Sequence, residues 1–149
     1  MVLKLLGQNP KDKALKGRGT KEADSAIREA RAGLMPVPNM LRAVLAAQVF
    51  VPLAAPPVME GNSIKSWKPA IVTKPAGGAE FLVAFTDASL AEVFTKSASD
   101  YTHGLLINVQ WLLSALPNNH GIVFNIGGTD SNFEWSAEGI SDYKVTNAS

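Results

Sequence analysis

Glu80-Phe-Leu-Val-Ala-Phe-Thr-Asp87 opens the stretch of sequence that decides the fold of this chain. Its apolar run, Phe81–Phe85, is bounded by turn-forming residues and predicts a buried strand. Thr86 and Asp87 follow, and either short polar side chain can cap a helix that we expect to end near Thr95. The amphipathic pattern of that helix places Leu90, Val93 and Phe94 on its buried side.

The same stretch continues through a second helix and a second strand as far as Asn125. Asn108 can cap the helix, and the strongest helical periodicity of the chain follows it at Val109, Leu112, Leu113 and Leu116. Gly121-Ile-Val-Phe-Asn125 then predicts a strand. Because strands and helices come in mixed order, a regular βαβ repeat is excluded. We therefore predict an α+β fold with a mainly antiparallel or mixed sheet packed by helices.

The N-terminal part of the chain predicts a helical extension of this fold. Residues 1–20 are polar, basic and rich in helix breakers, which predicts a flexible arm. Residues 21–35 predict an amphipathic helix capped by Thr20, and its thin apolar stripe has Ile27 as its one large side chain. A stripe this poor in large residues must lie on the body or on a partner. We expect residues 36–149 to form a single α+β domain.

Shorter elements complete the expected order. They are a helix over Met40–Gln48 capped by Asn39, a strand over Val49–Leu53, a loop over Ala54–Ser66, a hairpin of Ala70–Thr73 with Phe81–Phe85, a strand over Phe133–Trp135, and a last helix over Ala137–Tyr143 capped by Ser136.

The composition excludes several classes of protein. Of 149 residues, 46% are hydrophobic and 18% are charged, which is typical of a folded domain. The formal net charge is +1, which argues against a dedicated nucleic-acid binder. The chain has no Cys, so disulfides, thiolate zinc sites and Cys nucleophiles are excluded, and a cytoplasmic location is expected. No apolar run approaches the ~20 residues of a membrane helix, so no membrane partner is expected.

Several motifs in a fixed order resemble a known family. They are Val49-Phe-Val-Pro52, Phe81-Leu-Val-Ala-Phe-Thr-Asp87, the Leu112-Leu113 helix, Gly121-Ile-Val-Phe-Asn125 with Gly127-Gly128 beyond it, and Phe133-Glu-Trp-Ser-Ala-Glu-Gly-Ile140. With these motifs, the part from about Met40 to Lys144 is similar to the SseB N-terminal domain family of bacteria. One departure is Ile126, where that family tends to have Pro. The resemblance carries over no catalytic residue. It implies a role in binding or neutralising a partner, since domains like it occur near bacterial toxin and secretion genes.

The sequence offers little to a catalytic or metal-binding interpretation. Only His103 and His120 could act as imidazole bases, and both lie in Gly-adjacent segments that predict loops. No nucleophile elbow is present, and no His pair has the spacing of a metal site. We therefore expect no enzyme activity, no cofactor and no metal.

The three Trp residues are candidates for a protein-binding surface. Trp111 lies about 200° around its helix from Val109, away from the Leu stripe. Charged neighbours of Trp67 predict partial exposure, and Trp135 lies on a short strand between polar residues. With Ile27 on the N-terminal helix, these side chains form our predicted protein-binding set. The alternative interpretation is that Trp111 and Trp135 close a minor core.

These observations favour a non-catalytic bacterial interaction module, such as an immunity or adaptor protein for a toxin or secretion system. Its partner is expected to be a protein, and a homodimer is left open. The alternative is a small-molecule sensor or an enzyme with an unusual site, in which Thr86, Asp87 and Asn125 bind a polar ligand at strand ends. A secreted effector is a third alternative.

Overall fold

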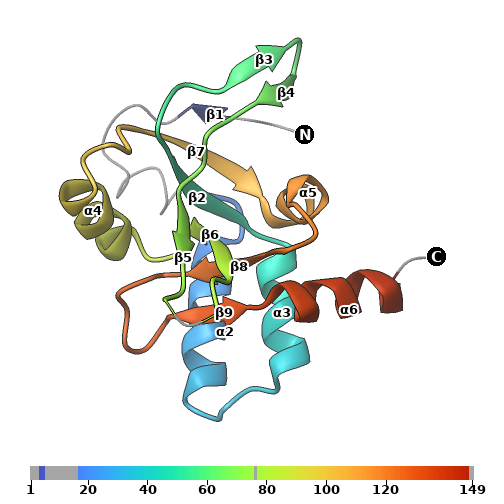
Figure 1. Ribbon diagram of the computed structural model, residues 1–149. Coiled ribbons are helices and arrows are strands. Elements are labelled where there is room, and N and C mark those ends of the chain that lie inside the picture. Colours follow the sequence, from blue (N-terminus) through green and yellow to red (C-terminus); the bar gives the residue numbers. More distant parts are fainter. Residues whose placement is uncertain (1–3, 6–16, 76, 148–149) are drawn as a thin grey trace.

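The computed structural model describes residues 4–5, 17–75 and 77–147 (Figure 1). Most of the predicted flexible arm, residues 1–20, lies outside the described residues. The helices are α2 (Thr20–Arg31), α3 (Val37–Leu45), α4 (Ala88–Ser97), α5 (Val109–Ala115) and α6 (Ala137–Asn147). The strands are β1 (Lys4–Leu5), β2 (Gln48–Leu53), β3 (Val58–Glu60), β4 (Ser63–Ser66), β5 (Ile71–Thr73), β6 (Glu80–Ala84), β7 (His103–Asn108), β8 (His120–Phe124) and β9 (Phe133–Trp135).

The two larger sheets, one antiparallel and one mixed in strand direction, confirm the predicted α+β class together with the helices. One sheet has the order β1-β7-β2 and is antiparallel. The other has the order β5-β6-β8-β9, and its central pair, β6 and β8, is parallel. Phe50 and Phe85 exchange two backbone hydrogen bonds of 3.0 and 2.8 Å, which join β2 to the end of β6. The two sheets therefore form one nearly continuous layer.

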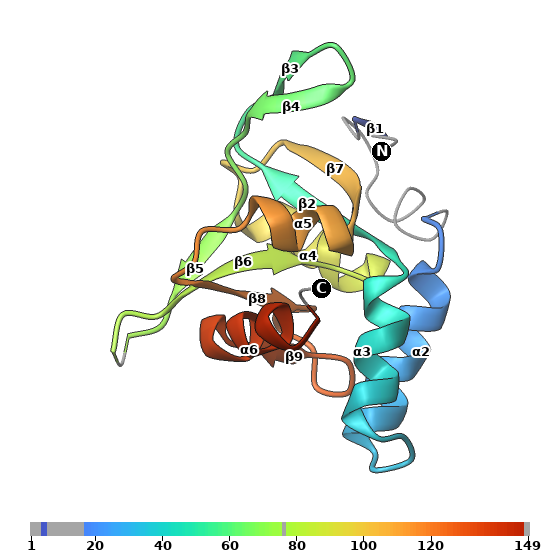
Figure 2. The same ribbon diagram turned by 90° about the vertical axis from the view of Figure 1, so that its right-hand side faces the viewer.

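Successive side chains of the central strands enter two different cores, as the two-residue period of a strand requires. Along β6, Phe81 and Val83 pack in one core, while Leu82 and Ala84 pack in the other. The strands β2, β7 and β8 alternate in the same way. Helix α4 covers one face of the layer, and α5 and α6 cover the other (Figure 2). Burial on both faces explains why these strands are continuous apolar runs in the sequence.

Helix α2 belongs to this folded body. It packs side by side with α3 (Figure 2). Its stripe of Ala23, Ala26 and Ile27 lies in the same core as α3, α5 and the sheet. The body, rather than a partner, thus covers the thin stripe, and the expected boundary at residue 36 does not separate two cores.

Three local predictions were wrong. Thr20 does not cap α2; Gly19 precedes the helix with a φ of 70°, and the Thr20 hydroxyl donates to the Gln48 carbonyl at 2.7 Å. Asn39 lies inside α3, which begins at Val37 because Pro36 and Pro38 suit a first helical turn. Val93 is 62% exposed, since the small residues Ala88 and Ala91 form the buried side of α4.

Two elements differ from the expected loops. The segment Ala54–Ser66 contains a hairpin, β3–β4, that extends away from the body (Figure 1). Its turn is at Gly61, with a φ of 63°. His103, whose segment predicts a loop, instead begins β7, the central strand of the first sheet. None of the helices in the described ranges has the length and apolar character to span a bilayer.

Candidate functional site

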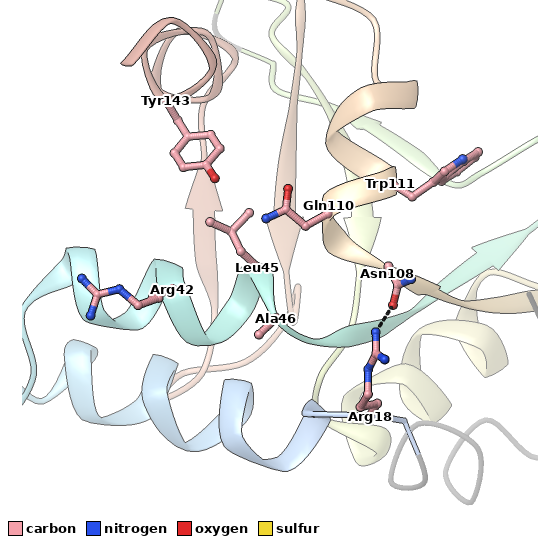
Figure 3. A pocket seen from close by; sticks show the side chains of 8 residues that line it. All are labelled: Arg18, Arg42, Leu45, Ala46, Asn108, Gln110, Trp111 and Tyr143. Atoms are coloured by element: carbon pink, nitrogen blue, oxygen red, sulfur yellow. Dashed lines mark hydrogen bonds between the residues drawn. The ribbon is translucent and has the colours of Figure 1, made fainter. Parts of the chain in front are cut away.

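A groove lies between helices on the described surface, and we call it the Arg–aromatic groove (Figure 3). Its volume is about 690 Å³, within the range of ligand-binding pockets. Side chains from several distant segments line it: Arg18, Arg42, Leu45, Ala46, Asn108, Gln110, Trp111 and Tyr143. The groove is therefore a product of the tertiary fold, and no short motif encodes it.

Two hydrogen bonds with Gln48 hold the backbone of Arg18 at one end of this groove. The Arg18 amide donates to Gln48 Oε1 at 2.9 Å, and the Gln48 amide donates to the Arg18 carbonyl at 2.7 Å. The guanidinium then donates through Nη2 to Asn108 Oδ1 at 3.2 Å (Figure 3). Asn108 precedes α5 as expected, but its side chain makes no cap hydrogen bond and contacts Arg18 instead.

Aromatic side chains form the rim of the groove. Trp111 points away from Gln110 in Figure 3. Its ring packs edge-on against the ring of Trp67, with 5.4 Å between the two ring centroids. Both Trp side chains are half-buried, which agrees with the expected partial exposure of Trp67 and the expected position of Trp111 off the Leu stripe. Tyr143 lines the groove from α6. Its ring packs edge-on against the ring of Trp135, with 5.6 Å between the two ring centroids.

The structure divides the predicted protein-binding residues into two groups. Ile27 is fully buried, and Trp135 is only 5% exposed. Both side chains are covered by the body, so no partner can contact them while the fold is intact. Trp67 and Trp111 are the predicted residues that reach the surface, and they do so together.

The predicted ligand residues also come together, at the carboxyl ends of the parallel strands β6 and β8. Asn125 is fully buried and has a φ of 58°, a conformation that Asn tolerates better than most residues. Its Oδ1 accepts hydrogen bonds from the backbone amides of Thr86 and Asp87 at 2.8 and 3.0 Å. Its Nδ2 donates to Thr86 Oγ1 and to the Ser131 carbonyl at 2.8 and 2.9 Å. An amide side chain offers two acceptor and two donor positions, so these contacts use the full capacity of Asn125.

Helix α2 closes over these strand ends through ionic contacts. Arg28 donates to Asp24 Oδ2 at 2.9 Å and to Asp87 Oδ2 at 2.7 Å, and its Nη1 lies 3.8 Å from Asp130 Oδ2. The hydrogen bond with Asp24 raises the pKa of Arg28 above its ordinary value, so the guanidinium stays charged at any working pH. Thr86 Oγ1 donates to the second oxygen of Asp24 at 2.9 Å. These contacts therefore join α2 to the sheet. We call this cluster the clasp; its residues are Asp24, Arg28, Thr86, Asp87 and Asp130.

Asp87 has two separable roles in this clasp. Its Oδ1 caps α4 by accepting from the amides of Ser89 and Leu90, and its Oδ2 pairs with Arg28. Asp87→Ala is expected to lower the free energy of unfolding by about 1.5 kcal/mol, because cap and ion pair are both lost. Asp87→Asn keeps a capping oxygen and should cost less than about 1 kcal/mol. Urea unfolding of both variants measures the difference. Equal losses in the two variants would contradict the capping role.

The two histidines lie apart from the Arg–aromatic groove and from the cluster at the ends of β6 and β8. His103 lies at the start of β7, with Nδ1 3.0 Å from the Thr102 hydroxyl. His120 begins β8, with Nδ1 2.9 Å from Asn119 Oδ1 and Nε2 3.6 Å from Glu80 Oε2. Within the described part of the chain, no three His, Asp or Glu side chains are grouped as a metal site requires.

Comparison with protein families agrees with the resemblance seen in the sequence. The family model for the SseB protein N-terminal domain matches residues 24–140, most of the chain. This chain belongs to the SseB N-terminal domain family. The match begins within α2, earlier than the expected start near Met40, so this helix is largely part of the SseB domain. No curated protein and no solved structure matches the chain.

Sequence reasoning missed four groove residues of this SseB domain: Arg18, Arg42, Gln110 and Tyr143. In the sequence, Arg18 falls within the arm predicted to be flexible, and Tyr143 ends the last predicted helix. Only the packing of α3, α5 and α6 around one hollow brings them together (Figure 3). The single early signal was Trp111, placed off its helix's apolar stripe.

Proposed function

We propose that this SseB-domain protein is a non-catalytic, cytoplasmic interaction module whose binding face is the Arg–aromatic groove with the Trp67–Trp111 pair at its rim. The observation that carries the proposal is the gathering of Arg, Trp and Tyr side chains from distant segments around one hollow. These three residue types dominate the energetic centres of protein interfaces. A protein partner is therefore favoured over a small metabolite.

The contacts of Asn125 argue against the alternative of a sensor or an enzyme at the strand ends. All four hydrogen-bonding positions of its side chain are used within the protein. Asp87 is similarly engaged by the start of α4 and by Arg28. A ligand would have to break these contacts before it could use the groups. The cluster is better explained as a structural clasp.

The narrower proposal is an immunity or adaptor role beside a toxin or secretion system. It is supported by family membership and by the described lining of the groove, which is made of Arg, amide, apolar and aromatic side chains. A toxin or secretion gene next to the coding gene would strengthen it. In that role, binding itself is the activity, because a neutralised partner needs only to be covered.

Co-purification from the native host tests the proposal. The tagged wild-type protein is expected to recover one host protein in near-stoichiometric amount, and Trp111→Ala should reduce that recovery at least about tenfold, as loss of an interface anchor does. Quantitative mass spectrometry of the eluates measures the ratio. Val93→Ala is the matched control, since Val93 is exposed on α4, across the sheet from the groove. Equal recovery by wild type and Trp111→Ala, or no stoichiometric partner, would contradict the proposal.

A further inference from the structure

The charge of the Arg–aromatic groove differs from that of the rest of the body. Residues 17–147, which include Arg18 and α2, contain twelve acidic and ten basic side chains, so this part of the chain is slightly acidic. The described residues that line the groove nevertheless include two guanidinium groups and no carboxylate. A local cation site on an acidic domain is selective, because the surrounding surface repels anions that lack a matching shape.

Neither guanidinium of the groove is neutralised by the described part of the protein. Arg28 on α2 has three carboxylates within ion-pair distance, whereas Arg18 contacts only the neutral amide of Asn108. Arg42, on the exposed side of α3, forms no ion pair with any described residue. The charges of Arg18 and Arg42 are thus available to an anion.

The two cations lie at different ends of the groove, and their spacing limits the type of ligand. In Figure 3, Leu45 and Ala46 lie between Arg42 and Arg18, and Gln110 and Tyr143 face this middle part from the other side. The two guanidinium groups therefore present two separate positive charges to a ligand. The apolar middle and separated charged ends suit an elongated ligand with an anionic group on each side of an apolar group.

We propose that the groove binds an acidic peptide segment of the partner protein, in which two Asp or Glu residues flank apolar side chains; this inference rests on the proposed function. Arg18 and Arg42 each pair with one carboxylate, with the planar geometry that a guanidinium provides. The apolar side chains of the segment contact Leu45 and the ring of Tyr143. The Gln110 amide can donate to and accept from the peptide backbone.

A nucleic acid fits this surface less well than a peptide does. Binding to a phosphate backbone needs many cations along a track, whereas this groove has two on an acidic domain. An acidic peptide needs only two ion pairs when apolar contacts supply the remaining affinity. The expected affinity is consequently sensitive to salt, but not abolished by it.

Selection from a random heptapeptide phage library on the full chain tests the inference. The selected peptides are expected to be enriched in Asp and Glu on both sides of an apolar residue. A synthetic copy of the best peptide should then bind the double variant R18Q/R42Q with a Kd at least about tenfold higher than that of wild type, because two charge-assisted contacts are removed. Isothermal titration measures the Kd. Replacing both acids of the peptide by Gln should cause a similar loss on wild type, and little further loss on the double variant.

R31Q/K96Q is the matched control, since it removes the same net charge from exposed positions that do not line the groove. Its Kd should stay within about twofold of wild type, which excludes a general effect of net charge. Thermal unfolding of each variant shows that the fold is kept. Selected peptides without acidic residues, or peptides that bind R18Q/R42Q as well as wild type, would overturn the inference. So would tighter binding of inorganic phosphate or a single-stranded oligonucleotide, or self-association abolished by R18Q/R42Q. A host partner recovered through Trp111 would still support the proposed function in each of these cases.

Discussion

Asn125→Ala is expected to lower the free energy of unfolding by about 4 kcal/mol. The substitution leaves the buried amide of Thr86, the amide of Asp87 and the Ser131 carbonyl without their partner. Unsatisfied buried groups cost about 1–3 kcal/mol each, and partial access of water at Asp87 reduces the sum. Alanine at a φ of 58° adds about 1 kcal/mol of backbone strain.

Two matched variants separate these contributions. Asn125→Gly removes the same hydrogen bonds but tolerates the positive φ, so it should be more stable than Asn125→Ala by about 1 kcal/mol. Asn125→Asp keeps the acceptor for the two amides and loses both donors, so its loss should fall below that of alanine near neutral pH. Urea unfolding at constant pH measures all three variants. A loss below about 1 kcal/mol for alanine would show that the cluster is not a structural clasp, and would restore Thr86, Asp87 and Asn125 as ligand residues.

The elements that sequence reasoning predicted well are those in which one local pattern decides the structure. The stripe of α5 is buried as expected, because its Leu residues repeat at helical spacing and no competing pattern overlaps them. Asp87 caps α4, as one of the two residues considered. The predicted hairpin of Ala70–Thr73 with Phe81–Phe85 is observed as the antiparallel pair of β5 and β6. In each case the information lies within a few neighbouring residues.

The elements that were missed depend on partners far away in the sequence. β7 is a short run between a polar loop and a strong helix, and its pairing with β1 and β2 makes it a strand. Asn108 could cap α5, but Arg18, ninety positions earlier in the chain, takes its side-chain oxygen. The Arg–aromatic groove depends on the same kind of long-range contact. Local patterns therefore predicted the class of fold and the strand-end cluster, but not the Arg–aromatic groove.

The burial of Ile27 makes a second large effect expected, because α2 is tied to the body by few large side chains. Ile27→Ala should lower the free energy of unfolding by about 3 kcal/mol, the sum of lost apolar burial and the cavity left behind. Ile27 is fully buried, and its stripe neighbours Ala23 and Ala26 are too small to fill the space. Leu34→Ala is the matched control. Leu34 is 77% exposed in the connection between α2 and α3, so its loss should stay below about 0.5 kcal/mol.

Ile27→Ala also distinguishes a helix that is part of the domain from one that only rests on it. If α2 folds together with the sheet, the variant should unfold in one transition, with the denaturant dependence of wild type. Amide hydrogen exchange should then show similar protection of α2 and of the central strands β6 and β8. Two separate transitions, with the helix lost first, would instead mean that α2 is an attachment. In that case the Arg28 clasp and the position of Arg18 in the groove would depend on a detachable segment, and the affinity of the groove for an acidic peptide would fall with the stability of α2.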